Sequence, residues 1–316
     1  MKTEPILHAV AGVIRNTNNE VLLARRHIHS HQGGLWEFPG GKVEEDETAQ
    51  QALNRELYEE LGILAEQMRP LIKIRHQYHD KEVLLDVWLI EKWSGWAFGK
   101  EGQLIMWTDE QELQYQPVPI ANYNIIKAVQ LPDKYLITPS PRSTCDKKFL
   151  YQFERCLDHD MQLIQLRAPE LSEQAYSLVA EKLLKLCQPY GAKLLVNGDV
   201  ELAMKLGADG VQLNSKRLMQ QKERPLSEDF LIGASCHTLQ EIEQANHIDA
   251  DFLLLSPVKT TATHPDTEPL GWSKFEQLIQ YTNHPVFALG GMGKKDVETA
   301  WSYGGQGIAA INGLWN

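Results

Sequence analysis

The sequence predicts a two-domain α/β protein whose second domain is a small (β/α)8 barrel. Three observations lead to this prediction. The chain has 316 residues, which is more than one ordinary domain contains. Its first part places strand-like segments around one long helical segment, whereas its second part alternates short apolar segments with amphipathic helical ones, as expected of repeated βα units. The pattern changes near Leu131, so we expect domains at residues 1–131 and 132–316.

The first domain combines strands with a helix that carries the most informative residues. A turn rich in asparagine, residues 16–19, separates the first two strands, because asparagine tolerates left-handed backbone geometry. The helix is predicted at Thr48–Leu61, since apolar or small residues recur there at helical spacing and Gly62 is suited to ending it. The strands are predicted at His8–Arg15, Glu20–Arg25 and Leu84–Trp93.

The second domain contains eight candidate strands in series, and helical patterns separate most of them. Such a series is typical of a (β/α)8 barrel. The strands are predicted at Tyr135–Thr138, Met161–Arg167, Lys193–Asn197, Gly210–Leu213, Phe230–Ala234, Phe252–Ser256, Val286–Gly290 and Gly307–Ile311. Only residues 312–316 follow the last of them, so the barrel is expected to lack its last helix.

The composition is that of a globular protein and excludes several classes. The formal net charge is −11, and the acidity is spread over both domains. There is no basic stripe, which argues against binding polymeric nucleic acid. No apolar segment approaches the ~20 residues that span a bilayer, and the four cysteines are scattered without a paired motif. We therefore expect a cytoplasmic protein with no membrane partner.

A group of glutamates on the predicted helix is the clearest chemical feature. Glu56 and Glu60 are four residues apart and Glu59 is three from Glu56, so all three lie on one helical face. Like charges at this spacing repel each other unless a cation neutralises them, and oxygen ligands suit Mg²⁺ or Mn²⁺. Arg55 can reach Glu59 on the helix and Glu47 in the preceding loop. The alternative is an acidic helix face that is only solvated.

These glutamates belong to a longer pattern. It reads Gly41, five residues, Glu47, seven residues, and then Arg55-Glu56-Leu57-Tyr58-Glu59-Glu60-Leu61-Gly62-Ile63. The pattern resembles the Nudix box at every specified position. Supporting segments at 24–26, 35–42, 99–103 and 119–122 make residues 5–130 similar to the MutT-type 8-oxo-dGTP diphosphatases. The resemblance implies a Nudix α/β/α sandwich and Mg²⁺-dependent hydrolysis of oxidised dNTPs to nucleoside monophosphate and pyrophosphate.

The resemblance also implies roles for individual residues. Metal would be held by Glu56, Glu59, Glu60, the Gly40 carbonyl and Glu101, with Arg55 and Glu47 completing the catalytic set. On the substrate side, Arg26 would lie near the phosphates, Phe38 beside the nucleoside, Asn122 at the purine edge, and Tyr78 and Lys81 on a loop over the base. The implied reaction is in-line attack by a metal-activated water, with Glu56 or a neighbouring carboxylate as the base.

Residues 134–316 resemble thiamine-phosphate synthase and its thiazole tautomerase relatives. The resemblance is carried by segments 165–167, 207–213, 235–238, 256–258 and 288–292. It implies a phosphate site that involves Arg167, His237, Gly290 and Gly291, which could hold a phosphorylated, thiamine-related ligand. The chain departs from the family at Ala168-Pro169-Glu170, Gly198, His264 and Asn312, where a basic residue, a metal-binding aspartate, a lysine and a serine are expected. We therefore expect a degenerate barrel without synthase activity.

Two other hypotheses about function stay open. The hydrolase could act on pyrophosphates of the thiamine pathway, or the barrel could be a non-catalytic module that senses a ligand and regulates the hydrolase. The histidines at 27, 29 and 31 could also bind a transition metal. A short loop with no fourth ligand, however, is more often only a polar loop.

Overall fold

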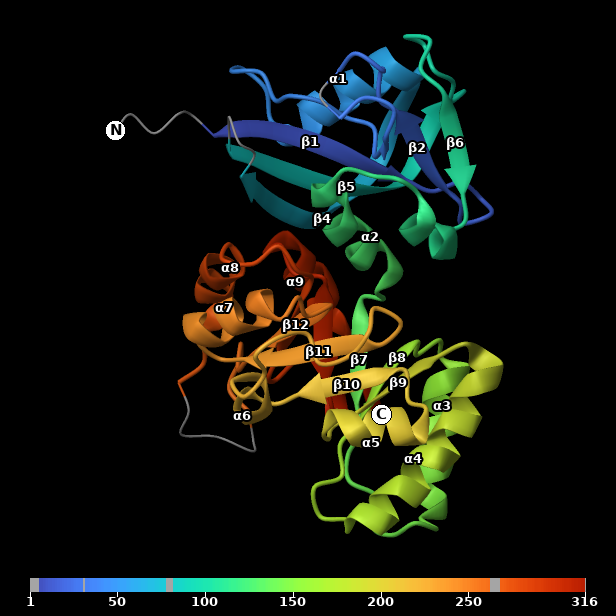
Figure 1. The fold of residues 1–316 in the computed structure, drawn as a ribbon, viewed down its shortest axis with the longest axis vertical. Coiled ribbons are helices and arrows are strands. Elements are labelled where there is room, and N and C mark those ends of the chain that lie inside the picture. Colours follow the sequence, from blue (N-terminus) through green and yellow to red (C-terminus); the bar gives the residue numbers. More distant parts are fainter. Residues whose placement is uncertain (1–5, 31, 78–81, 262–267, 316) are drawn as a thin grey trace. The chain divides into compact units, whose positions relative to one another are not determined.

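The computed structural model describes residues 6–30, 32–77, 82–261 and 268–315 (Figure 1). Four residues singled out above, His31, Tyr78, Lys81 and His264, lie outside the described residues. The chain divides into two compact units, Met1–Gln130 and Leu131–Asn316, and each is described by itself below.

The first unit is built from two small sheets and the helices that cover them (Figure 1). Its strands are β1 (Leu7–Ile14), β2 (Val21–Arg25), β3 (Trp36–Glu37), β4 (Ile63–Gln77), β5 (Glu82–Gly95) and β6 (Ile105–Thr108). Its helices are α1 (Ala49–Leu61), η1 (Glu110–Tyr115), η2 (Ile120–Asn122) and α2 (Tyr123–Gln130). The strand orders are β1-β5-β4, in which β1 and β5 are parallel, and β3-β2-β6, which is antiparallel.

Successive residues of strand β1 belong to two different apolar clusters. Val10 and Ile14 pack with the buried face of α1, whereas Ala11 and Val13 pack with the buried face of α2. This alternation is the two-residue period of a strand that is covered on both faces. The unit is the expected α/β/α sandwich of a Nudix fold.

Helix α1 forms where the sequence predicts a helix. Thr48 caps its start, because the Thr48 side chain accepts from the Gln51 backbone and the Gln51 side chain accepts from the Thr48 backbone. Gly62 ends it in the left-handed conformation at φ 72°. The buried residues Ala52, Leu53, Leu57 and Leu61 form its apolar face. The catalytic glutamates predicted from the sequence therefore lie on the helix away from the core.

The longest strand, β4, was not predicted. Its 15 residues pair with β5 in an antiparallel ladder that has three register shifts, the last of them between Pro70 and Ile72. Such bulges interrupt the alternation of apolar and polar residues, and proline is unfavourable inside a strand. Pairing along the whole of β5, rather than the local pattern, therefore holds β4 in the sheet.

The second unit is a closed barrel of eight parallel strands. These are β7 (Lys134–Ile137), β8 (Leu163–Leu166), β9 (Lys193–Val196), β10 (Gly210–Leu213), β11 (Leu231–Cys236), β12 (Phe252–Leu255), β13 (Val286–Leu289) and β14 (Gly307–Ala310). The outer helices are α3 (Lys147–Asp158), α4 (Glu173–Cys187), η3 (Gln188–Tyr190), α5 (Val200–Leu206), α6 (Ser215–Leu218), α7 (Leu239–His247), α8 (Gly271–Ile279), η4 (Lys294–Asp296) and α9 (Val297–Ser302). All eight strands were predicted, and the predicted barrel is confirmed.

A single helical turn, α10 (Asn312–Trp315), follows the last barrel strand. The Trp315 ring packs against Phe149 and Phe153 of α3, with ring centroids 5.0 and 6.5 Å apart. The Trp315 carbonyl accepts a hydrogen bond from Gln152 Nε2 at 2.6 Å. The Trp315 side chain thus covers apolar surface of α3.

Within the part of the chain that the structure describes, no helix has both the length and the apolar character needed to cross a membrane.

Candidate functional site

The site begins at a glycine turn that lies against β1. The Gly12 and Val10 amides donate to the Pro39 and Gly41 carbonyls, each at 2.8 Å. Gly40 between them has φ +149°, and a Cβ there would lie 2.2 Å from the Val10 carbonyl oxygen, so only glycine fits. Among the described residues no hydrogen bond reaches the Gly40 carbonyl. That oxygen is thus available as the backbone ligand that the resemblance implies.

The glycine turn also contacts two of the α1 glutamates. The Gly40 amide donates to Glu60 Oε2 at 3.3 Å. A Cβ on Gly41 would lie 2.3 Å from Oε1 of Glu56, so that carboxylate rests against the Gly41 backbone. The two glycines therefore allow the backbone of the turn to lie directly against the carboxylates of α1.

Arg55 connects the loop before α1 to the helix. Its Nη2 and Nε donate to the two Glu47 oxygens at 2.6 and 3.1 Å, and its Nη1 donates to Glu56 at 2.9 Å and to Glu59 at 3.3 Å. The bond to Glu47 raises the pKa of Arg55 and lowers the pKa of Glu47. Arg55 Nη2 also donates to the Lys42 carbonyl at 3.0 Å. Arg55 therefore holds the loop and neutralises part of the charge on the helix face.

Glu60 is the most perturbed of these carboxyl groups. Burial, followed by the neighbouring charges of Glu37, Glu56 and Glu101, raises its pKa to about 8, although the hydrogen bond from Gly40 acts in the opposite direction. Four carboxyl groups from β3, from α1 and from the loop before β6 thus act on one another. Charged oxygens brought together in this way favour a cation between them.

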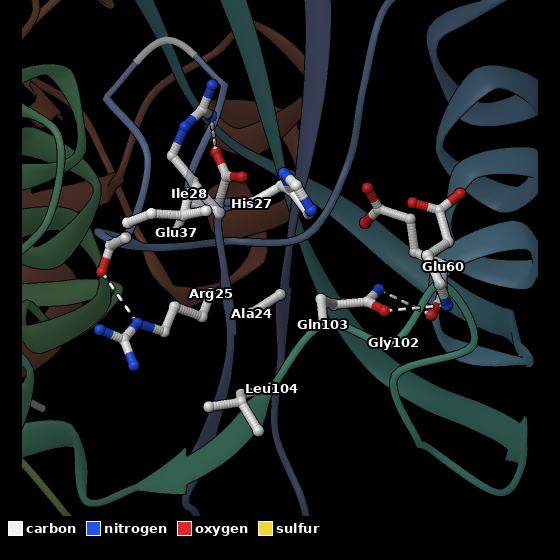
Figure 2. A pocket seen from close by; sticks show the side chains of 12 residues that line it. Ala24, Arg25, His27, Ile28, Glu37, Glu60, Gly102, Gln103 and Leu104 are labelled. Carbon is white, nitrogen blue, oxygen red and sulfur yellow. Dashed lines mark hydrogen bonds and ion pairs between the residues drawn. The ribbon is translucent and has the colours of Figure 1, made fainter.

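The loop before β6 reaches Glu60 because it caps the end of α1. The amides of Phe98 and Lys100 donate to the carbonyls of Leu61 and Glu60 at 3.2 and 2.9 Å. Gln103 Nε2 donates to the Glu60 carbonyl at 2.9 Å (Figure 2). These bonds satisfy carbonyls that a helix end leaves without partners. Docking of the loop brings Glu101 to the α1 carboxylates.

A pocket of about 380 Å³ opens beside Glu60. Glu37, Glu60 and Glu101 line it together with Arg26 and His27, and Figure 2 shows the side chains that face it. Arg26 forms an ion pair with Glu37. The pocket therefore has both the acidic groups that attract a metal ion and a guanidinium that suits phosphate oxygens.

Phe38 and Asn122 are the two predicted base-side residues that the structure describes, and both are buried. Phe38 is 3% exposed and packs in one core cluster with Val118 and Ala121, next to Asn122. Asn122 is 6% exposed, and its side-chain amide makes no hydrogen bond within the described residues. The Asn122 side-chain amide is also not one of the buried polar groups that are completely shielded from solvent without a hydrogen-bond partner. A ligand can therefore reach a buried donor and acceptor at this position.

The barrel residues lie at the carboxyl ends of their strands, as in other barrels with sites there. Arg167 follows β8 and is exposed, while the His237 ring after β11 is oriented by the Ser256 carbonyl, 2.8 Å from its Nδ1. Gly290 and Gly291 after β13 adopt positive φ values of 101° and 66°. Residues 290–291 pack closely against the loop after β12, since a Cβ on either would lie 2.9 Å or less from that loop.

Asp199, the residue after Gly198, caps the start of α5. Its Oδ1 accepts a hydrogen bond from the Leu202 amide at 2.8 Å.

Comparison with known families assigns both units. The family model of the NUDIX domain matches residues 10–128, and that of thiamine monophosphate synthase matches residues 134–314. The 8-oxo-dGTP diphosphatase of Escherichia coli (strain K12) is 40% identical over 120 residues, which are 38% of this chain and 93% of that protein. The chain belongs to both families.

Two further relatives support the assignment. The 8-oxo-dGTP diphosphatase of Proteus vulgaris is 45% identical to the Nudix domain over 96 residues, which are 30% of this chain and 86% of that protein. A provisionally named thiamine-phosphate synthase 2 of Aquifex aeolicus (strain VF5) is 30% identical over 184 residues, which are 58% of this chain and 98% of that protein. The chain is therefore an enzyme whose N-terminal domain is a Nudix hydrolase domain similar to the 8-oxo-dGTP diphosphatases.

The residues of the Nudix site fit a divalent metal. In the described ranges no three His, Cys, Asp or Glu side chains stand close enough together to enclose an ion as they are placed. Glu56 and Glu59 instead form ion pairs with Arg55, which donates a hydrogen bond to each, and the Glu59 side chain is 54% exposed. The donors are nevertheless all oxygens, which are the ligands that Mg²⁺ and Mn²⁺ prefer. Glu56, Glu59, Glu60, Glu101 and the Gly40 carbonyl are the groups that would hold it.

Sequence reasoning did not single out Glu37, Lys100 and Gln103. Glu37 is one residue before Phe38, and the other two flank Glu101, so the segments that support the resemblance contain all three. Their importance depends on contacts with residues more than ten positions away, and no local pattern reveals such contacts.

Proposed function

We propose that the Nudix domain, residues 1–131, hydrolyses oxidised dNTPs, with 8-oxo-dGTP as the leading substrate, to nucleoside monophosphate and pyrophosphate in the presence of Mg²⁺ or Mn²⁺. The observation that carries the proposal is the meeting of Glu37, Glu56, Glu60 and Glu101 beside a pocket of about 380 Å³. The similarity to two 8-oxo-dGTP diphosphatases supports the choice of substrate.

The chain's own residues would divide the work. Mg²⁺, when bound, would supply positive charge against the phosphates and make a nearby water more acidic. Glu56 or a neighbouring carboxylate would accept the proton of that water, Arg55 would keep Glu56 and Glu59 oriented, and Arg26 would contact phosphate oxygens. Asn122 would pair with the edge of the base.

A substrate panel with a pyrophosphate readout tests the proposal. We expect Mg²⁺-dependent release of pyrophosphate from 8-oxo-dGTP, with a higher kcat/KM than for dGTP. If pyrophosphates of the thiamine pathway were cleaved faster, the alternative hydrolase hypothesis would replace this one. Separation of the products would identify the bond that is cut, since nucleoside monophosphate must be the other product.

Replacing Asn122 by alanine should destabilise the transition state for hydrolysis of the nucleotide that carries the oxidised base. One amide can pair with two adjacent groups on the edge of the base. We therefore expect kcat/KM for 8-oxo-dGTP to fall by an amount that corresponds to about 1–3 kcal/mol of transition-state stabilisation, with a smaller change for dGTP. The control is Asn124→Ala, two residues along the chain, which should behave like the wild type. Equal losses for both nucleotides would contradict a role of Asn122 in base recognition.

For the barrel, residues 132–316, we propose that it binds a phosphorylated, thiamine-related ligand without synthase turnover. Release of a pyrophosphate leaving group needs a divalent metal and several cations on its oxygens. Gly198 stands at the metal position and Asp199 caps a helix, while Arg167 remains exposed for an anion. The barrel would then sense a ligand and tune the hydrolase.

Incubation of the whole chain with both synthase substrates and Mg²⁺ should yield no thiamine phosphate above the uncatalysed level. A rise of the thermal midpoint with thiamine phosphate is expected, because a ligand that binds only the folded state stabilises it. The Arg167→Ala variant should lose that rise. Steady formation of thiamine phosphate would overturn this proposal and leave the one for the Nudix domain intact.

We further propose that the protein is cytoplasmic. All four cysteines are free thiols, three of them buried, which suits a reducing compartment.

A further inference from the structure

Glu37 and Arg26 meet across two short strands at the pocket. In the antiparallel ladder of β2 and β3, Ala24 lies opposite Glu37, and the Arg26 amide donates to the Leu35 carbonyl at 2.9 Å. Arg26 and Glu37 are therefore diagonal neighbours on one face of the pair, a spacing that long side chains can bridge. Ala24 is small enough to leave the space between them open, and the two side chains form an ion pair there.

The adjacent arginine is held in a different way. Arg25 lies opposite Trp36 in the same ladder, so its side chain leaves the other face of the strand pair. Its Nε donates to the Gly34 carbonyl at 3.1 Å, and its guanidinium lies 5.9 Å from the Trp36 ring centroid. The two consecutive arginines thus have different partners, and Arg26 is the one that forms an ion pair with Glu37.

The Arg26–Glu37 pair belongs to the same electrostatic environment as Glu60. Glu37 and Glu60 line one pocket (Figure 2), and among the neighbouring charges Glu37 has the largest effect on the pKa of Glu60, ahead of Glu56. Burial raises the pKa of Glu37 itself, and the positive charge of Arg26 opposes that rise. Both side chains are about a quarter to a third exposed, at 25% for Arg26 and 30% for Glu37. A ligand in the pocket can therefore reach them.

We propose that Glu37 is a positioning residue that holds the Arg26 guanidinium at the pocket, where it binds the phosphate oxygens of the nucleotide; this inference rests on the proposed function. A guanidinium carries five N–H donors in one plane, and this fixed geometry suits both carboxylate and phosphate oxygens. An arginine without its carboxylate must be ordered each time a nucleotide binds. This role differs from that of the α1 glutamates, which would hold metal, whereas Glu37 would hold Arg26.

A double-mutant cycle at saturating Mg²⁺ tests the inference. Glu37→Gln should raise KM about tenfold with less than about a threefold change in kcat, and Arg26→Ala should raise KM at least as much. When Arg26 is already alanine, Glu37→Gln should have no further effect, because the group that it positions is absent. Glu37→Asp, which keeps the charge, should lie between the wild type and Glu37→Gln.

The matched control is Arg25→Ala, whose effect should add to that of Glu37→Gln, since Arg25 has other partners. Independent effects of Glu37→Gln and Arg26→Ala would overturn the inference. So would a fall in kcat with unchanged KM and a weaker apparent affinity for Mg²⁺, which would make Glu37 a metal ligand. If Glu37→Gln proves unfolded by circular dichroism, the same cycle is run with Glu37→Asp and Arg26→Lys.

The cycle uses whichever substrate of the panel the wild type hydrolyses fastest. Failure of the proposed substrate therefore appears in the wild type, whereas failure of the positioning role appears only in the variants.

Discussion

Glu60→Gln is expected to lower kcat of the Nudix domain by ~100-fold or more at saturating Mg²⁺, because one charged ligand of a metal-assisted transition state is worth several kcal/mol. Glu56→Gln should have an effect of the same order. The measurement is pyrophosphate release from the best substrate of the panel. Glu66→Gln, on an exposed position of β4, is the control and should retain full activity. Near-normal activity of either site variant would mean that the metal site lies elsewhere.

The same substitution should not damage the fold. The pKa of Glu60 is raised to about 8 from its ordinary value of 4.5. A raised pKa means that the folded protein favours the protonated carboxyl, so this contribution to stability is present at low pH and is lost as the pH rises through about 8. Glutamine carries no charge to lose. Without metal at pH 9, the thermal midpoint of the Nudix domain in Glu60→Gln should therefore equal or exceed that of the wild type.

The two glycines of the turn should respond differently to alanine. In Gly40→Ala the new Cβ would meet the Val10 carbonyl, a backbone atom that cannot move away, at a φ of +149°. We expect the Nudix domain to lose about 3 kcal/mol or more in free energy of unfolding. In Gly41→Ala the Cβ would meet the carboxylate end of Glu56, which can swing aside. The fold should then survive, while kcat falls ~100-fold because the Glu56 carboxylate is displaced.

Thermal unfolding and pyrophosphate release, measured on both variants, check this pair of expectations. Gly102→Ala gives the cost of a left-handed backbone alone, because it has φ +82° and no atom within 4 Å of a Cβ. A Gly41→Ala variant with wild-type kcat would show that the position of the Glu56 carboxylate does not matter for catalysis.

The sequence alone determined the local features of this protein. Helix α1 was predictable because its apolar spacing, its capping box and Gly62 all act within a few residues of one another. The barrel strands were predictable because each is a short apolar segment buried on both faces, and their serial order with helices between them admits few topologies. The spacing of Glu56, Glu59 and Glu60 likewise places them on one face of any helix.

Only the tertiary structure decided which distant groups share the site. Glu101 reaches Glu60 because the loop before β6 caps the end of α1, and Glu37 reaches Arg26 because β2 and β3 pair in one particular register. Strand β4 is in the sheet because β5 pairs with it despite Pro70 and three register shifts. The physical reason is common to all three. Hydrogen bonding between remote segments and the burial of charge depend on the assembled fold, and local residue order does not contain them.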